Sequence, residues 1–587
     1  MDVRESLCLL CPLGCKIGLR VKGQAVVGPE FCPGQGLNDG RVCPRGLYAT
    51  ELLNHPQRVA TPLVRRDGRL REVAWDDAIG ELASRLKGIL SASGPQSVAI
   101  VTDPTRSTEE LRAVGRLARS LGTDAVSCVF EPQDRPLMAA GESADPSSFE
   151  EAACTVAFGD VFTTHPVLSK RIIDAKYAAR GNSLFVVAPR RSNLAWFASE
   201  HVQNRPGTEA LVLAAMLKAV RALGRSDSKS AAWVDTVDDG KLLDAAGVSR
   251  ETVARMARSF VDAEKAVVVV APPMRGIADV GLVSSLASLL ASIAGADRQY
   301  VSLPSGGNSR GSLKVAIEEA WKPASRLVAD LEEGKYRALL SFGADISAAY
   351  PSSELKRALC GLELVATFSM LPGEIEDLSS VVLAGASWLE SAGSATFFDG
   401  SVERWQAVVP PSWGTLPMGD AISLLQRSLG GVDGSASKEA SPGSPGKAAS
   451  VSDASFPERL ESVRSEAVAA SAQGMVVISL ASTGHSGCGN VTRRMDWAAE
   501  MLPGDFVELS QEDATAEGIC EGDRIVLTSA SGEAEARARI TDRLQAGVVA
   551  VPEYDVNMRA LFSWRAADDG WFSTGPGAAR LTAKRKS

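Results

Sequence analysis

Short apolar runs alternate with amphipathic stretches along most of this 587-residue chain. The run AVVVVA at 266–271 is apolar throughout, which is typical of a strand buried on both faces. The stretch TEELRAVGRLARS at 108–120 instead repeats its apolar residues with the helical period. The pattern predicts strands at 97–101, 155–158, 183–187, 266–271, 338–342, 364–367 and 380–383, and helices at 108–120, 167–179, 209–223 and 280–293.

This alternation predicts an α/β protein with mainly parallel sheets, whose ligands bind beyond the carboxyl ends of the strands. Turn residues add smaller elements before the first sheet. Asp67-Gly68 predicts a hairpin over 63–73, and Lys22-Gly23 predicts one over 21–27. Residues 46–53 are expected to form a helix, and Trp75 opens another that has Asp76 or Asp77 as its N-cap.

The C-terminal part has a different pattern. Residues 428–455 are rich in Gly, Ser, Ala and Pro, which predicts a flexible linker. Beyond it, short β segments are separated by turns rich in Gly and Asp, which favours a small β-barrel of mixed topology. The segments lie at 475–478, 506–509, 524–528, 535–540 and 548–551.

Length, charge and composition narrow the functional classes. A chain of 587 residues is long enough for three to four domains. The formal net charge of -9 argues against nucleic acid as a partner, because phosphate binding depends on clustered Lys and Arg. The apolar stretch at 281–296 is too short to span a bilayer, and no leader pattern is visible, so direct membrane insertion is not expected. Ten scattered cysteines fit a reducing cytoplasm better than a disulfide framework.

Four of these cysteines have the spacing of metal-cluster ligands. Cys8, Cys11 and Cys15 lie on one short segment, and Cys43 follows after a gap of 27 residues. This arrangement is typical of a [4Fe–4S] cluster. A structural zinc site is the alternative, although zinc motifs usually pair two C-x2-C knuckles and the second is missing. Cys32, between the third and fourth thiol, is a candidate substitute ligand.

A series of longer motifs follows the cysteines in a fixed order. They are HPQRVATPLVR, AWDDA, STEELRAVGRLARSLGT, THPVLSKRI, VVAPRRS, RPGTEALVLAAM, PSGGNSRGS, DLSSVVLAGASWLESAG, DGSVERWQ, GHSGCGNVTRRM and FVELSQEDATAEGICEGDRIVLTSASGE. Together they resemble the molybdopterin oxidoreductase family, which includes formate dehydrogenases, nitrate reductases and the large iron–sulfur subunit of respiratory complex I. The resemblance implies a multidomain α/β fold with a C-terminal barrel of the molybdopterin-dinucleotide-binding type. The implied divisions are a [4Fe–4S] cluster domain at 1–60, a discontinuous α/β domain at 61–155 and 300–427, an inserted α/β domain at 156–299, the linker at 428–455 and the barrel domain at 456–587.

The resemblance also shows where a molybdenum or tungsten ligand is expected. In active members a Cys, selenocysteine, Ser or Asp side chain ligates the metal. Here Gln133 falls on that position, and Asp134 falls on the neighbouring histidine position. A neutral carboxamide does not replace a thiolate, so the interpretation is a loop without a metal ligand. A shift of the loop by one residue would offer Asp134, and a shift by five would offer Cys128.

Residues of the family's dinucleotide motifs are partly retained. Phe158 stands where relatives have a close-approach glycine, Asp160 follows it, and Ala188 replaces an aspartate. Arg45, next to the fourth cysteine, occupies the family's position between cluster and pterin. The remaining residues implied to bind a molybdopterin guanine dinucleotide, with or without metal, are Arg205, Gly207, Thr208, Glu209, Gly306, Asn308, Thr492 and Arg493.

These observations favour an iron–sulfur electron-transfer subunit of a cytoplasmic multi-subunit oxidoreductase, NAD(P)H- or formate-linked, with a degenerate molybdopterin site. One cluster without a flavin or pyridine-nucleotide motif cannot complete a reaction, so the expected partners are redox subunits of the NAD(P)H oxidoreductase type that carry flavin, iron–sulfur clusters or both. The alternative is an active molybdenum or tungsten bis-pterin enzyme, such as a formate dehydrogenase with an atypical ligand. A purely structural role is the third hypothesis, and the four cysteines argue against it.

Overall fold

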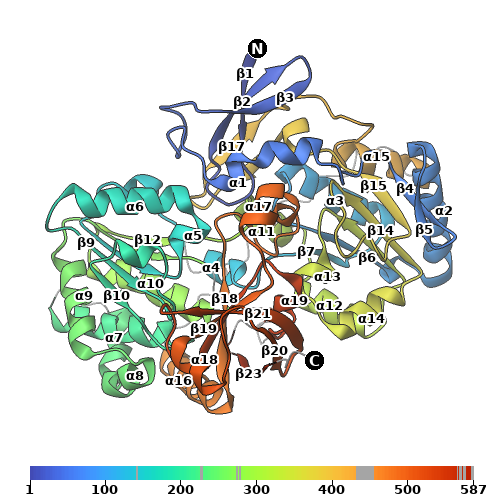
Figure 1. Ribbon diagram of the computed structural model, residues 1–587. Helices are drawn as coiled ribbons and strands as arrows, with labels where there is room; N and C mark the ends of the chain where they lie inside the picture. Colours follow the sequence, from blue (N-terminus) through green and yellow to red (C-terminus); the bar gives the residue numbers. More distant parts are fainter. Residues whose placement is uncertain are drawn as a thin grey trace.

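The computed structural model describes residues 1–139, 143–224, 229–272, 275–276, 279–430, 455–564, 566, 572, 575 and 577–583. Two α/β units stand side by side, with the N-terminal module above them and a barrel between them below (Figure 1). Most of the predicted linker at 428–455 lies outside the described residues, because 431–454 are not among them.

The N-terminal module is a three-stranded antiparallel sheet whose loops carry the predicted cluster cysteines. The sheet has the order β1-β2-β3 and supports two short helical turns. Its elements are β1 (Asp2–Leu7), β2 (Lys16–Lys22), β3 (Ala25–Glu30), α1 (Pro44–Leu47) and the 3-10 helix η1 (Ala49–Asn54).

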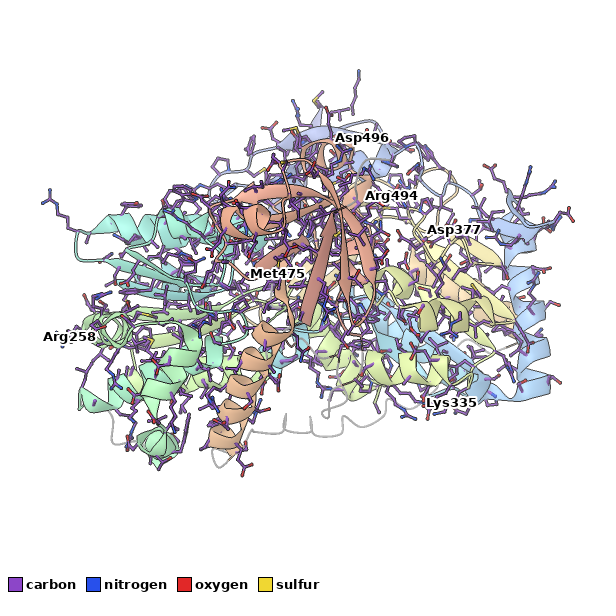
Figure 2. All side chains as sticks on the ribbon, turned by 60° about the horizontal axis from the view of Figure 1, so that its bottom comes forward. Arg258, Lys335, Asp377, Met475, Arg494 and Asp496 are labelled. Carbon is purple, nitrogen blue, oxygen red and sulfur yellow. The ribbon has the colours of Figure 1, made fainter. Side chains whose placement is uncertain are left out.

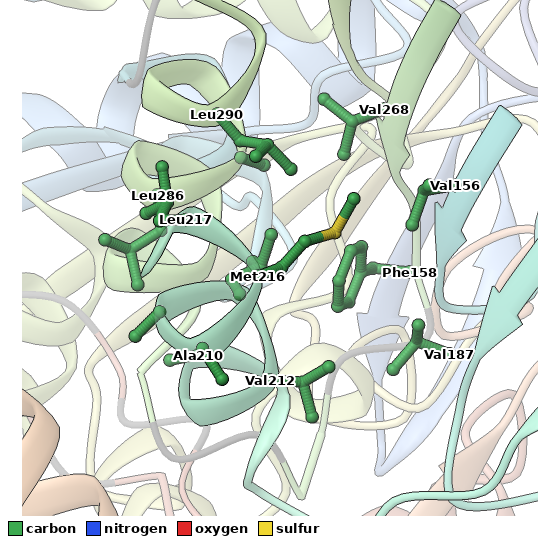
Figure 3. Packing of buried hydrophobic residues seen from close by; sticks show 14 of the residues in the cluster. Val156, Phe158, Val187, Ala210, Val212, Met216, Leu217, Val268, Leu286 and Leu290 are labelled. Carbon is green, nitrogen blue, oxygen red and sulfur yellow. The ribbon is translucent and has the colours of Figure 1, made fainter. Parts of the chain in front are cut away.

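The first α/β unit contains a five-stranded parallel sheet of order β10-β9-β8-β11-β12. Its strands are buried on both faces, which explains their continuous apolar runs. Figure 3 shows Met216 of α7 beside the ring of Phe158 at the end of β8. The elements are β8 (Cys154–Phe158), β9 (Ser183–Val187), β10 (Glu200–Val202), β11 (Ala266–Val270), β12 (Arg298–Ser302), α5 (Val161–Thr164), α6 (Pro166–Ala178), α7 (Glu209–Ala222), α8 (Asp239–Ala246), α9 (Arg250–Asp262) and α10 (Val280–Ala294).

The second unit contains a seven-stranded sheet of order β5-β4-β15-β14-β13-β6-β7. Only the hairpin β4–β5 at its edge runs antiparallel to its neighbours. The elements are β4 (Leu63–Arg66), β5 (Arg69–Glu72), β6 (Val98–Thr102), β7 (Val126–Cys128), β13 (Ala338–Phe342), β14 (Leu364–Ser369), β15 (Val381–Ala384), α2 (Trp75–Ser93), α3 (Thr108–Leu121), α4 (Asp134–Ala139), α11 (Ser309–Glu318), α12 (Ala324–Glu332), α13 (Ile346–Ala349), α14 (Ser353–Cys360) and α15 (Met418–Leu429), with a small ribbon of β16 (Gly393–Thr396) and β17 (Val402–Trp405).

The C-terminal part is a closed barrel of order β18-β22-β19-β21-β20-β23. Figure 2 shows helix α16 leading into the barrel at Met475, the first residue of β18. The elements are α16 (Phe456–Gln473), β18 (Met475–Leu480), β19 (Phe506–Ser510), β20 (Arg524–Ser529), β21 (Glu533–Thr541), β22 (Val548–Pro552), β23 (Gly577–Ala583), α17 (Asp496–Met501), α18 (Gln511–Ala516) and α19 (Val556–Arg559).

The structure corrects several details of the prediction. The expected domain boundaries at 155/156 and 299/300 cut through β8 and β12, which both belong to the five-stranded sheet. Ala74 is the N-cap of α2, so Asp76 and Asp77 lie in the first turn, where their charges favour the positive helix end. The helix expected at 46–53 is interrupted at Tyr48, whose ring stacks on Trp497 at 4.8 Å. The sixth barrel strand, β23, was missed because GAARLTA contains one large apolar residue.

A buried ion pair joins the N-terminal module to the seven-stranded unit. Arg58 donates to the Leu53 carbonyl (2.8 Å) and to both carboxylate oxygens of Glu390, and the two side chains are 0% and 1% exposed. Glu390 also accepts a hydrogen bond from the Ser387 amide (2.8 Å). Removing the charge of one partner in a buried ion pair strongly destabilises the folded protein, because the other charge is then uncompensated.

We therefore expect Glu390→Gln to lower the free energy of unfolding by about 3 kcal/mol or more. The matched control is Glu81→Gln, which breaks the exposed pair of Glu81 with Arg85 and is expected to cost less than about 1 kcal/mol. Urea unfolding followed by circular dichroism measures both. Equal effects of the two substitutions would contradict the assigned role of the buried pair.

Candidate functional site

The four predicted ligand cysteines lie together below the N-terminal sheet. Cys8, Cys11 and Cys15 are at most 6% exposed and occupy the loop between β1 and β2, which the hydrogen bond from the Cys8 amide to the Cys15 carbonyl (2.9 Å) closes. Cys43 immediately precedes α1. Burial raises the pKa of each of the three loop thiols, and neighbouring thiolates raise the pKa of Cys8 and Cys15 further. These thiols therefore ionise only when a cationic centre binds them.

The spacing of these cysteines in the sequence favours a cluster over a zinc ion, because the second C-x2-C knuckle of a zinc motif is missing. In the described part of the chain, no three His, Cys, Asp or Glu side chains converge closely enough to hold one metal ion. Cys32 lies apart against Gly18, and the charges that raise its thiol pKa, after burial, are those of Glu5 and Glu30.

Arg45 is the buried cation beside this group. Its side chain is hydrogen-bonded to Cys43, and the Cys43 and Cys11 thiolates raise the pKa of its guanidinium against the effect of burial. Its two terminal nitrogens donate to the Thr164 carbonyl (2.5 Å) and the His485 carbonyl (3.2 Å). Arg45 thus connects the cluster loop to the five-stranded unit and to the loop that follows β18.

A large cleft, here called the central cavity, lies directly behind the cluster loop. It encloses about 1170 Å³ of empty space, open solvent included. The cluster loop, the carboxyl ends of β6, β13, β14 and β15, and the loop at 486–492 form its wall. The lining residues are Leu9, Leu10, Asp103, Pro104, Thr105, Arg106, Val129, Glu131, Asp134, Ser305, Gly306, Gly343, Ala344, Asp345, Ala349, Ser369, Met370, Leu371, Ala386, Ser387, Trp388, Ser486, Gly487, Cys488, Asn490, Val491 and Thr492.

The loop in which a metal ligand was expected is braced by its own side chains. Asp134 is fully buried at the start of α4 and accepts hydrogen bonds at both carboxylate oxygens, from the Ser305 amide (2.8 Å) and the Ser309 hydroxyl (3.3 Å). Burial, and then Glu131, raises the pKa of Asp134 to about 7. The amide of Gln133 donates to the Ser305 hydroxyl (3.2 Å). Both residues therefore hold the 305–309 loop in place. Cys128 is buried in the core beside Ser312, and burial raises its thiol pKa.

Next to Glu131 in the cavity wall lies a group of buried charged side chains that the sequence did not predict. Arg559, 1% exposed, donates to Glu131 (3.1 Å) and to the carbonyls of Glu553 and Ala349. Burial, and then Glu131, raises the pKa of Glu553 to about 8. Burial, and then Arg559, lowers the pKa of Arg275 to about 9. Arg275 lies after the buried strand β11. Because ligands bind beyond the carboxyl ends of such strands, this position in the sequence could have identified Arg275 as a candidate site residue.

A second pocket, here called the sheet–barrel pocket, lies between the five-stranded sheet and the barrel. It encloses about 570 Å³ of empty space, open solvent included. The carboxyl ends of β8 and β9, the start of α7 and the end of β18 form its wall. The lining residues are Gly159, Asp160, Val187, Ala188, Pro189, Arg190, Ser192, Glu209, Arg275, Gly276, Ile478, Ser479, Leu480 and Ala481.

The structure corrects the expectation that Phe158 obstructs a ligand. Phe158 is 0% exposed and packs into the core below the sheet, so its ring does not reach the pocket. The next residue, Gly159, lines the pocket with φ +93. Gly159, and not position 158, therefore corresponds to the glycine that approaches the ligand in relatives. Asp160 caps α5 by accepting from the Thr163 amide (3.2 Å), and burial raises its pKa.

Of the four predicted residues at 205–209, only Glu209 lines the pocket. Arg205 donates to the last carbonyls of α8, at Asp244 (3.0 Å) and Ala245 (3.3 Å). Gly207 (φ +83) and Thr208, whose hydroxyl donates to the Arg205 carbonyl (2.6 Å), form the turn that starts α7. This turn places Glu209 at the pocket.

The other predicted residues lie around the central cavity. Gly306 and Thr492 line it, and the Thr492 hydroxyl accepts from the Ser486 amide (3.2 Å). Asn308 is fully buried behind the wall, where its side chain donates to the Arg106 carbonyl (2.8 Å) and accepts from the Thr396 amide (2.7 Å). Arg493 lies next to the wall and pairs with Glu374 at 3.3 Å.

Comparison with known proteins agrees with this geometry. A family model described as "Molybdopterin oxidoreductase" matches residues 58–416, its "Fe4S4 domain" model matches residues 1–55, and a "Molydopterin dinucleotide binding domain" model matches residues 475–586. The chain belongs to the molybdopterin oxidoreductase family. It therefore contains that family's [4Fe–4S] domain and molybdopterin-dinucleotide-binding domain.

The individual proteins that this chain resembles have different named activities. NADPH-Fe(3+) oxidoreductase subunit alpha of Geobacter sulfurreducens is 27% identical over 95% of this chain and 72% of its own length. F420-dependent formate dehydrogenase 1 subunit alpha of Methanococcus maripaludis is 22% identical over 94% of both chains. Acetylene hydratase from Pelobacter acetylenicus shares the fold, with a TM-score of 0.75 over 99% of this chain and 100% of that chain at 15% identity. Among the described helices, none has the length and apolar character that a membrane span requires.

The residues present fit the family's dinucleotide best in the sheet–barrel pocket. Arg275, Glu209 and Ser192 are each at most 4% exposed, and each has a buried polar atom without a hydrogen-bond partner among the described residues. Such atoms are costly unless a ligand or water satisfies them. When bound, the pterin would supply a redox-active ring system, and these three side chains would bind and orient the dinucleotide.

The cluster assignment leads to a direct test. We expect Cys11→Ser to remove the low-temperature EPR signal of the reduced protein, because three thiolates do not hold the cubane in place. Cys32→Ser is the matched control and is expected to keep both the signal and the iron content. An unchanged signal in Cys11→Ser, or its loss in Cys32→Ser, would refute the ligand set.

Proposed function

We propose that this chain is the iron–sulfur electron-transfer subunit of a multi-subunit oxidoreductase and that its molybdopterin site has lost the catalytic metal. The observation that carries the proposal is the braced loop at 133–134. Gln133 offers a neutral amide where relatives have an anionic ligand, and both oxygens of Asp134 already accept hydrogen bonds. A soft metal site needs a deprotonated, soft ligand, and neither side chain supplies one.

The position of Arg45 supports an electron-transfer role. A positive charge beside a [4Fe–4S] cluster stabilises its reduced, more negative form and so raises the reduction potential. The Arg45 guanidinium is 3% exposed and hydrogen-bonded to Cys43, so water screens its effect weakly. A cluster with this neighbour is suited to accept single electrons from a donor subunit.

The partner is proposed from the chemistry that this chain lacks. One cluster transfers one electron at a time, whereas NAD(P)H and formate are two-electron donors. A flavin-containing subunit, with or without further clusters, converts between the two. The relatives named above are alpha subunits, one of an NADPH-linked and one of a formate-linked enzyme. We propose an NAD(P)H-linked complex in the cytoplasm, with formate as the second donor to test.

One observation favours the alternative, an active molybdenum or tungsten enzyme with an atypical ligand. The amide oxygen of Gln133 is buried and has no hydrogen-bond partner among the described residues. An unsatisfied acceptor at the ligand position is compatible with metal contact. The carboxamide remains neutral, however, and this is why electron transfer is preferred.

Elemental analysis separates the two functions. We expect the purified protein to contain about four iron atoms per chain and no more than traces of molybdenum and tungsten. Gln133→Cys is the informative variant, because a thiolate at this position restores the ligand type. One molybdenum or tungsten atom per chain in the unaltered protein would overturn the proposed function.

The electrostatic role of Arg45 predicts a change in potential. We expect Arg45→Met to lower the midpoint potential of the cluster, because the reduced state loses a neighbouring positive charge. Arg45→Lys keeps the charge and is expected to remain closer to the unaltered protein. Redox titration followed by EPR measures both at equal iron content, and an unchanged potential in Arg45→Met would contradict the role.

A further inference from the structure

We propose that this chain binds a single molybdopterin dinucleotide, in the sheet–barrel pocket, and that the central cavity takes no second one. This inference rests on the proposed function in one respect, since a bis-pterin metal centre needs two dinucleotides. It goes beyond that function because it assigns the stoichiometry of the ligand. The two pockets differ in their unsatisfied polar groups and in their charge.

The unsatisfied polar groups of the lining residues favour the sheet–barrel pocket. Four buried atoms on its wall have no partner among the described residues: Nε and Nη2 of Arg275, Oε2 of Glu209, and the hydroxyl oxygen of Ser192. None of the described residues that line the central cavity has such an atom, although the Gln133 amide oxygen beside that cavity is unsatisfied. Buried polar groups are almost always paired in native proteins. The lining of the sheet–barrel pocket therefore leaves more polar groups for a ligand than the lining of the central cavity does.

Arg275 has the geometry of a phosphate-binding side chain. Its guanidinium lies 3.8 Å from the centre of the Trp564 ring, which fixes the plane of the fork. Nε and Nη2 of this guanidinium are buried and have no hydrogen-bond partner among the described residues. Planar, preorganised arginine forks bind phosphate oxygens in pairs. Arg190, on the same wall, is held by two hydrogen bonds to Glu508 (2.6 and 2.9 Å).

Glu209 supplies a complementary group at the other end of the wall. One of its oxygens accepts from the Asn204 amide (2.9 Å), and the other is unsatisfied. A carboxylate with a free oxygen accepts hydrogen bonds from N–H groups of a nucleobase. A phosphate-binding arginine and a base-binding carboxylate in one pocket match the two ends of a nucleotide.

The central cavity has the opposite charge character. Among its described lining residues, four carry carboxyl groups, and Arg106 alone carries a positive charge. That charge is already paired, because Arg106 donates to Asp103 at 3.0 Å. The four carboxyl groups are those of Asp103, Glu131, Asp134 and Asp345. A diphosphate placed among them would lose its hydration without gaining a counter-charge.

The stoichiometry can be measured without any activity. Protein produced in a host that makes the cofactor is acid-hydrolysed, and the nucleoside monophosphate released is counted against protein and iron. We expect about one nucleotide per chain at about four irons. Two nucleotides per chain would overturn the inference, and so would none.

When only part of the purified protein carries the nucleotide, variants of the two pockets can still be compared by their nucleotide content. Arg275→Gln is expected to lower the nucleotide content about tenfold or more, since a charged hydrogen bond to phosphate is lost. Ser192→Leu, which fills the same pocket, is the second variant if Arg275→Gln does not fold. The control is Ala386→Phe, which narrows the central cavity and is expected to leave the nucleotide content unchanged. A drop to half in Ala386→Phe, at unchanged iron content, would show a second dinucleotide and overturn the inference.

The outcomes separate this inference from the proposed function. Two nucleotides without molybdenum or tungsten would overturn the single-site inference and leave the electron-transfer role standing. One nucleotide together with one molybdenum or tungsten per chain would overturn the electron-transfer proposal and leave the single-site inference standing.

Discussion

The Arg45 guanidinium is the point at which the separate parts of this molecule meet. A buried charge is costly unless it is paired. Arg45 has partners from three parts of the chain: the Cys43 thiol, the Thr164 carbonyl of the five-stranded unit and the His485 carbonyl beyond the first barrel strand. The neighbouring cysteines favour a cation there whenever they are thiolates. The contacts of Arg45 therefore help to position the cluster loop, the α/β unit and the barrel relative to one another.

The two pockets follow from this arrangement. Parallel sheets leave open crevices beyond their strand ends. The sheet–barrel pocket lies beyond the ends of β8 and β9, and the central cavity lies beyond the ends of β6, β13, β14 and β15. The cluster loop closes one of them tightly, since a Cβ on Gly307 would lie 2.0 Å from the Leu9 carbonyl oxygen. The Ser486 hydroxyl donates to the Leu10 carbonyl (2.7 Å) and closes the same wall from the barrel side. The central cavity thus lies between the cluster loop and the sheet, whereas no described residue of the cluster loop lines the sheet–barrel pocket.

The sequence predicts those features that depend on local pattern. The cysteine spacing, the buried run at 266–271 and the Asp67-Gly68 turn each specify their structure within a few residues, and the cluster domain and barrel are found where expected. Features set by contacts between distant segments were not predictable. Arg275 and Arg559 are 284 residues apart in number and become neighbours only when the barrel packs on the sheets. Phe158 was misread because a one-residue shift at the end of β8 turns its side chain into the core.

The loss of a catalytic ligand does not require the loss of the dinucleotide. Residues 431–454 separate the barrel from the α/β units in the chain, so the described contacts that attach the barrel are noncovalent ones across the seam. Arg190 crosses it with two hydrogen bonds to Glu508, and the Arg191 amide donates to the Arg543 carbonyl (2.9 Å). The sheet–barrel pocket opens on this same seam, with Glu209 on one side and Ser479 on the other. A ligand that satisfies both sides stabilises the attached barrel by its binding free energy. A dinucleotide bound in that pocket would therefore contribute to the assembly of the fold, whether or not a metal is bound near Gln133.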